Sequence, residues 1–257
     1  MGRIKRVIFA LGMTAPLMGA LISFGPAPAL ADTSSSTLAV ENNAVLAPEE
    51  KLAKAKDDLT KALDLSLRKV DSLKSRLNEL NFPELSQEEK LKSNALEDLQ
   101  AYADYYNKAK EDLEKKTSLE EVKDLAKDVK EYRDTTYTPG VEKIVKFILV
   151  FYNEQVLGVA SERLGKIEAD VKKLDKLGVI KENDFRGELD ETGKLLEEAG
   201  KLQGEAKKII LSATSTDLTN EEEPSARDMI ETSLNNVKTV YDIFLELNQS
   251  VKKALGL

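Results

Sequence analysis

Apolar residues recur along most of this chain at steps of three and four residues, with charged residues between them. That spacing places the apolar side chains on one face of an α-helix. The first stripe predicts a helix from about Glu49 to Leu80, opened by Pro48 and ended by Asn81-Phe82-Pro83. Alternation of period two, the pattern of half-buried β-strands, does not reach a useful length anywhere.

Two Ser-x-x-Glu sequences mark the starts of the next two predicted helices. Ser86-Gln87-Glu88-Glu89 and Ser118-Leu119-Glu120-Glu121 have the form of capping boxes, in which the serine and glutamate side chains bind free backbone N–H groups. The second helix reaches about Leu113 and the third, which is shorter, reaches about Tyr132. We expect Asp134 to Gly140 to form a turn around Pro139.

The second half of the chain predicts three further helices. The fourth is the most apolar, begins near Val141 and ends at Leu177, with Gly178 as its C-terminal cap. The fifth runs from about Asp184 to Ala213, and the sixth starts within 224–228. The predicted fold is all-α: long amphipathic helices in an antiparallel, coiled-coil-like bundle. A helical hairpin plus a short third helix (49–134) precedes a three-helix bundle (141–257).

The first 31 residues have the three parts of an export signal. Arg3, Lys5 and Arg6 form a basic start, Val7–Phe24 is uncharged and mostly apolar, and Ala29-Leu30-Ala31 presents a cleavage site. We therefore expect residues 1–31 to be a signal peptide, followed by a flexible, Ser-rich leader over 32–48. The alternative is an uncleaved anchor, since the apolar run is about long enough to span a bilayer. Either alternative predicts an extracytoplasmic protein that is secreted, periplasmic or at the cell surface.

Charge and composition exclude several classes of function. Removing the three basic residues of the signal takes the net charge from −8 to −11, which disfavours binding to nucleic acid and to anionic lipid. The chain has no Cys and no His. These absences exclude ordinary structural zinc sites, iron–sulfur clusters and the usual haem ligands. We predict no catalytic residue, no metal ligand and no cofactor-binding residue.

The run Phe147–Tyr152 is apolar almost all round its predicted helix. We interpret it as the centre of a bundle contacted on several sides. A membrane-inserting element over 144–152 is the alternative. Lys143, Lys146 and Glu154 lie so close to the run that no segment beyond the signal is expected to cross a membrane.

Tyrosines and glycines supply further candidates. Tyr102 and Tyr106 share a face with the leucines and are predicted to be core residues, whereas Tyr105 faces elsewhere and is a candidate surface contact. Interior helical glycines cost about 1 kcal/mol each relative to alanine. They therefore suggest close helix packing, with a hinge or ligand groove as the alternative. The glycines concerned are Gly158, Gly165, Gly193, Gly200 and Gly204.

Several short stretches match known functional motifs only in part. We interpret these matches as chance occurrences or as solvent-exposed surface. The acidic stretch 217–223 lacks the spacing of a calcium loop. Ser66-x-x-Lys69 and Ser250-x-x-Lys253 match a serine–lysine spacing without the partner motifs of that active site. Asn248-Gln249-Ser250 fits a glycosylation sequon, which arises readily by chance.

These patterns predict an exported, non-enzymatic helical protein of the cell envelope that acts as a structural or protein-interaction module. We expect a protein partner or self-association, because narrow apolar stripes on long helices are often completed in oligomers. The alternatives are an extracytoplasmic chaperone or carrier for apolar clients, and a membrane-active helical protein. The identity of the partner and the oligomeric state do not follow from the sequence.

Overall fold

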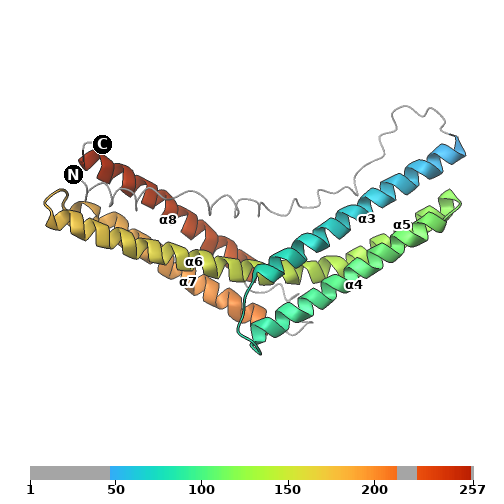
Figure 1. Ribbon diagram of the computed structural model, residues 1–257, viewed down its shortest axis with the longest axis horizontal. Helices are drawn as coiled ribbons and strands as arrows, with labels where there is room; N and C mark the ends of the chain where they lie inside the picture. The colour runs from blue at the N-terminus through green and yellow to red at the C-terminus, as the bar shows by residue number, and fades with distance from the viewer. Residues whose placement is uncertain (1–46, 213–224, 256–257) are drawn as a thin grey trace. The chain divides into compact units, whose positions relative to one another are not determined.

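The computed structural model describes residues 47–212 and 225–255, and every regular element in this part of the chain is helical (Figure 1). The prediction of an all-α bundle of long helices is confirmed. The predicted signal peptide 1–31, nearly all of the leader 32–48 and the acidic stretch 217–223 lie outside the described residues. The elements are α3 (Pro48–Glu79), α4 (Gln87–Lys115), α5 (Leu119–Tyr132), η3 (Arg133–Tyr137), α6 (Thr138–Lys176), η4 (Glu182–Phe185), α7 (Arg186–Ser212) and α8 (Ala226–Ala254).

The described chain folds as two compact units. The first unit comprises residues 47–158, 197–212 and 225–237, and the second comprises residues 159–196 and 238–255. Helices α6, α7 and α8 each contribute residues to both units. The predicted division into 49–134 and 141–257 stays a prediction.

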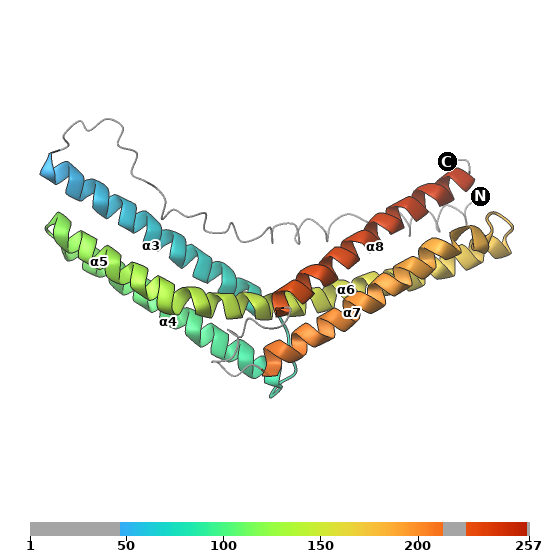
Figure 2. The same cartoon turned by 180° about the vertical axis from the view of Figure 1, so that it is seen from behind.

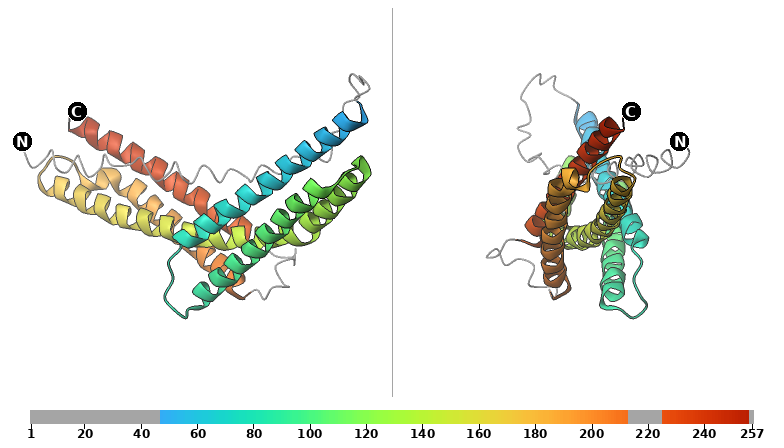
Figure 3. Two further views of the ribbon diagram at one scale, coloured as in Figure 1. Left: turned by 45° about the vertical axis from the view of Figure 1, so that its right-hand side comes forward. Right: turned by 90° about the vertical axis from the view of Figure 1, so that its left-hand side faces the viewer.

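In the first unit, α3 and α4 form an antiparallel hairpin, and α5 lies beside it (Figures 2 and 3). The predicted stripes meet in its core, where Leu63 of α3, Leu99 and Tyr106 of α4 and Val122 of α5 are buried. Ser118 and Glu121 form the predicted capping box of α5. At the start of α4 the structure records the serine half of the predicted capping box, in which the Ser86 side chain accepts a bond from the Glu89 backbone N–H.

The second unit contains the turn that joins α6 to α7. Gly178 adopts a positive φ of 67°, and its N–H bonds to the carbonyl of Asp175. The Val179 N–H bonds to the carbonyl of Leu174, so α6 ends in a Schellman motif and the predicted glycine cap is confirmed. Val171 and Leu174 of α6 are buried, as is Phe244 of α8.

The predicted turn over 134–140 is wrong, because the chain stays helical there. The π-helix η3 widens the helix by one residue, and the Thr138 N–H bonds to the carbonyl of Arg133. Thr135 Oγ1 donates a 2.8 Å bond to the Glu131 carbonyl. Pro139 directly follows η3 within one continuous helix, and the extra residue of the π-helix accommodates its ring and its missing N–H, so Pro139 does not end the helix.

Close helix packing does not explain the interior glycines, so this prediction is also wrong. A Cβ atom built at Gly158, Gly165, Gly193, Gly200 or Gly204 meets no atom within 4 Å. Each of these glycines therefore lies at an open position on its helix, where a methyl group fits without a clash.

We expect Gly165→Ala and Gly200→Ala each to raise the free energy of unfolding by about 0.5–1 kcal/mol, because alanine loses less backbone entropy in a helix. Urea denaturation of the purified protein measures the change. Gly178→Ala is the matched control and should lower the free energy of unfolding, because the left-handed backbone at this position costs an alanine about 1–2 kcal/mol. Destabilisation by all three substitutions would contradict the conclusion that Gly165 and Gly200 have room for a methyl group.

The apolar run of α6 lies largely inside the first unit. Phe147, Ile148, Val150 and Phe151 are buried, which confirms the core interpretation. The expectation that no segment beyond the signal crosses a membrane stays a prediction. The elements α5, η3 and α6 form one continuous helical stretch, Leu119–Lys176. Among the described residues, this stretch is long and apolar enough to cross a membrane by length and composition alone, and half of its apolar window is buried in the protein.

Candidate functional site

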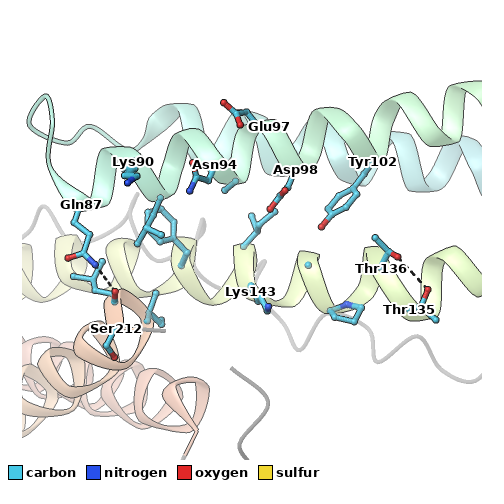
Figure 4. Close-up of a pocket in the computed structure, with 18 residues that line it drawn as sticks. Gln87, Lys90, Asn94, Glu97, Asp98, Tyr102, Thr135, Thr136, Lys143 and Ser212 are labelled. Carbon is cyan, nitrogen blue, oxygen red and sulfur yellow. Dashed lines mark hydrogen bonds between the residues drawn. The ribbon is translucent and has the colours of Figure 1, made fainter. Parts of the chain in front are cut away.

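A groove of about 1070 Å³ runs between one face of α4 and one face of α6 in the first unit (Figure 4). We call it the α4/α6 groove. The end of α7 closes one of its ends, where Gln87 Nε2 donates a 2.6 Å bond to the Leu211 carbonyl. The groove is lined by Gln87, Lys90, Leu91, Asn94, Ala95, Glu97, Asp98, Tyr102, Thr135, Thr136, Pro139, Gly140, Lys143, Ile144, Phe147, Ile210, Leu211 and Ser212.

The helical spacing of the two walls explains why the groove has an apolar floor. Its residues recur three or four apart on both α4 and α6, so each helix turns one continuous face toward the groove. Ala95, Ile144, Phe147 and Ile210 are buried and form the floor. The polar side chains stand above this floor, with Asn94 and Asp98 exposed on α4.

Charged groups stand on both walls of the groove. Asp98 projects from α4 toward α6, whereas Glu97 points to the other side of α4 (Figure 4). Neighbouring protein atoms partly desolvate the Asp98 carboxyl and raise its pKa. The negative charge of Glu97 raises this pKa further, while Lys143 of α6 acts in the opposite direction. A cation that entered the groove beside Asp98 would stabilise this carboxylate.

Tyr102 forms the far end of the groove and belongs to a cluster of tyrosines. A Cβ atom at Gly140 would overlap the Tyr102 hydroxyl oxygen and lie 2.9 Å from its Cζ, so only glycine leaves room for this side chain. Behind the groove, the Tyr137 ring lies 5.4 Å from the Tyr102 ring and 5.3 Å from the Tyr106 ring, edge to face in both pairs. The groove wall is thus continuous with the aromatic core between α4 and η3.

The tyrosine cluster predicts loss of stability at high pH. Burial raises the pKa of Tyr102 and of Tyr137 to about 12, and it also raises the pKa of Tyr106. An unperturbed tyrosine has a pKa of about 10, so the folded state holds these protons more tightly than the unfolded state does. The resulting stability is complete below about pH 10 and is lost as the pH rises toward 12.

Tyrosinate absorbance and circular dichroism, followed together against pH, measure this effect. We expect tyrosinate to form in step with the loss of helix, and Tyr137→Phe to reduce the loss of stability between pH 10 and 12. Formation of all the tyrosinate near pH 10 with the helices intact would contradict the prediction.

A buried polar layer joins α6, α7 and α8 within the first unit. Asn153 Nδ2 donates 2.9 Å bonds to Gln203 Oε1 and to Ser233 Oγ. Gln203 Nε2 donates to the Val150 carbonyl, and Ser233 Oγ donates to the Ala199 carbonyl. Asn153 and Ser233 are fully buried and Gln203 is 5% exposed. These bonds fix the three helices against one another at one level.

The tyrosines that the sequence singles out contribute to packing between helices. Tyr102 and Tyr106 are buried, which confirms their prediction as core residues. Tyr105 is half-buried, and its ring stacks on Tyr132 at 3.5 Å while its hydroxyl donates to the Asp128 carbonyl. Tyr105 therefore connects α4 to α5.

The short sequence matches within the described residues lie on helices, and their side chains bond to the backbone, face solvent or are buried. Ser66 Oγ donates to the Ala62 carbonyl of its own helix. Ser250 and Lys253 both lie on the exposed side of α8. Asn248, the acceptor residue of the sequon, is 9% exposed, which disfavours attachment of a glycan. The charge pair of Glu197 and Lys201 is solvent-exposed.

The sequence pattern does not single out Asp98, Lys143 or Asn153 as site residues. Asp98 and Lys143 lie on helices separated by α5, and only the packing of α4 on α6 brings them to one groove. Asn153 did carry a signal, because it is a polar residue directly after the apolar run that ends at Tyr152.

Comparisons of the chain with protein families, with characterised proteins and with solved structures gave no match. Within residues 47–212 and 225–255, no three acidic side chains come together as a metal site would require.

Proposed function

We propose that this chain is an exported, non-enzymatic helical protein of the cell envelope that acts as a structural or protein-interaction module through the α4/α6 groove. The α4/α6 groove carries the proposal, because it combines an apolar floor with a polar rim and is open along two helices. From Gln87 to Tyr102 it follows α4 for about 22 Å at 1.5 Å per residue, the length of about fifteen helical residues. Grooves of this kind bind the apolar face of a helix from a partner.

The exposed charges agree with a protein-binding role. Lys115 pairs with Asp112 on α4, and Arg227 pairs with Glu231 on α8, on exposed helical faces. Such pairs keep the outer faces of the helices solvated and contribute little to stability. The apolar floor of the groove therefore differs in character from the faces around it.

Site-specific photo-crosslinking in the producing cells tests the proposal. A photoreactive residue replaces Asn94 in the groove, and the matched control replaces Asn107, also an exposed asparagine of α4 and about 220° further round the helix. We expect one dominant protein, or a second copy of this chain, to be captured at position 94 and not at position 107. The captured protein, purified separately, should then bind the full chain in solution.

Two results would overturn the proposal. Equal capture at both positions would show that the groove is not the contact surface. Capture of many unrelated exported proteins at position 94 would instead indicate an extracytoplasmic chaperone for apolar clients.

Export is tested separately through the N-terminus of the mature protein. The proposal predicts that the protein is recovered outside the cytoplasm and that its first residue is Asp32. Recovery in the membrane fraction with Met1 still present would indicate the anchor alternative, and recovery in the cytoplasm would overturn the export proposal.

A further inference from the structure

We infer that the α4/α6 groove binds an amphipathic helix of a partner protein and places one lysine or arginine of that helix beside Asp98. This inference rests on the proposed protein-interaction role and adds the chemistry of the partner. It is carried by the shape of the groove and by the charges that stand on its walls.

The shape of the groove favours a helix as the occupant. Its floor consists of side chains from two helices that each present one face, and Ile210 of α7 completes it. An incoming helix would bury residues spaced three and four apart against this floor. Its polar side would remain in solvent above Asn94 and Thr136, which are both exposed on the rim.

One negative feature of the groove selects a cation. It is Asp98, which points from α4 into the space between the helices (Figure 4). Within the described residues, no ion pair joins it to a cation, and Lys143 acts on it only at longer range.

Lys90 limits how much positive charge the partner carries. It stands on the α4 wall toward the α7 end. Its charge would repel a helix with several cations in the groove. The partner that fits is an apolar helical stripe with a single basic residue at the level of Asp98. The raised pKa of the Asp98 carboxyl agrees with this arrangement, because a bound cation would offset its desolvation.

Two synthetic peptides test the inference with the full chain. Both carry the same leucine and alanine stripe over fifteen residues, and they differ only in one central position, which is lysine in one and glutamate in the other. At physiological ionic strength we expect the lysine peptide to bind more tightly. Asp98→Asn should weaken its binding roughly tenfold, because it removes the charge-assisted hydrogen bond to the lysine. Asp98→Lys should reverse the preference in favour of the glutamate peptide.

Asp104→Asn is the matched control, because Asp104 is an exposed carboxylate of α4 outside the groove that accepts a bond from Gln100. We expect it to leave binding unchanged within twofold, and circular dichroism checks that each variant stays folded. Equal weakening by Asp98→Asn and Asp104→Asn would overturn the inference, because the acidic chain would then attract the lysine peptide non-specifically. Failure of both peptides to bind would overturn it as well.

The two proposals fail in different ways. If position 94 captures a dominant partner in cells while Asp98→Asn leaves peptide binding unchanged, the groove is a docking site, but the inferred pairing of Asp98 with a lysine or arginine of the partner is wrong. If position 94 captures nothing above the control at position 107, the protein-interaction role of the groove fails, and this inference fails with it.

Discussion

Asn153→Ala should lower the free energy of unfolding by about 2–4 kcal/mol, because it leaves two buried acceptors without their donor and opens a cavity. Gln203 Oε1 and Ser233 Oγ both accept from Asn153 at 2.9 Å, and all three side chains are buried. Urea denaturation followed by circular dichroism measures the loss. Asn107→Ala, at an exposed asparagine of α4, serves as the control and should change stability by less than about 0.5 kcal/mol.

Replacement of the whole polar layer should have a different effect from removal of one member. The triple variant Asn153→Leu, Gln203→Leu and Ser233→Ala replaces every polar side chain of the layer by an apolar one, so none is left buried without a partner. We expect it to be at least about 1 kcal/mol more stable than Asn153→Ala, since an apolar layer avoids the desolvation of half-satisfied groups. If the triple variant were less stable than Asn153→Ala, the hydrogen bonds would contribute more than their burial costs, contrary to this expectation.

The polar layer also has a consequence for the alignment of α6, α7 and α8. An apolar stripe alone tolerates a shift of one helix along another, whereas the Asn153 bonds are made at one relative position only. Polar residues in coiled-coil cores fix register in this way at a cost in stability. We therefore expect the triple variant to show broader side-chain NMR signals from the first unit than the original chain does.

Local sequence patterns were sufficient to predict the helices because their physical causes are local. The stripe from Leu63 to Leu77 predicts the buried face of α3, and Ser118 with Glu121 predicts the first turn of α5. Gly178 predicts the end of α6, since its left-handed backbone suits glycine. Each of these features depends on residues no more than a few turns apart.

The features that the sequence did not predict depend on contacts between distant segments. Pro139 normally ends a helix, but here the extra residue of η3 accommodates it within the stretch from α5 to α6. The α4/α6 groove brings together Asp98, Lys143 and Ile210, which lie on three helices. Periodicity shows which face of a helix is apolar, but it does not show where two such faces stay partly uncovered.

Gly140→Ala should lower the free energy of unfolding by about 1–3 kcal/mol, the usual cost of an extra methyl group in a filled space. The added Cβ would overlap the Tyr102 hydroxyl and lie 2.9 Å from Cζ, so Tyr102 must move. Gly158→Ala in the same helix is the control, because nothing lies within 4 Å of a Cβ there, and it should be stabilising by up to about 1 kcal/mol.

Tyr102→Phe provides the second arm of a double-mutant cycle. Removing the hydroxyl relieves the worst overlap but not the contact with Cζ, so Tyr102→Phe should recover only part of the stability lost through Gly140→Ala. We expect the two substitutions together to be less destabilising than the sum of the single changes by about 0.5–2 kcal/mol, as for residues in direct contact. Additive effects would show that Gly140 does not make room for Tyr102. Because Tyr102 ends the α4/α6 groove, Gly140→Ala should also weaken binding of the lysine peptide, whereas Gly158→Ala should not.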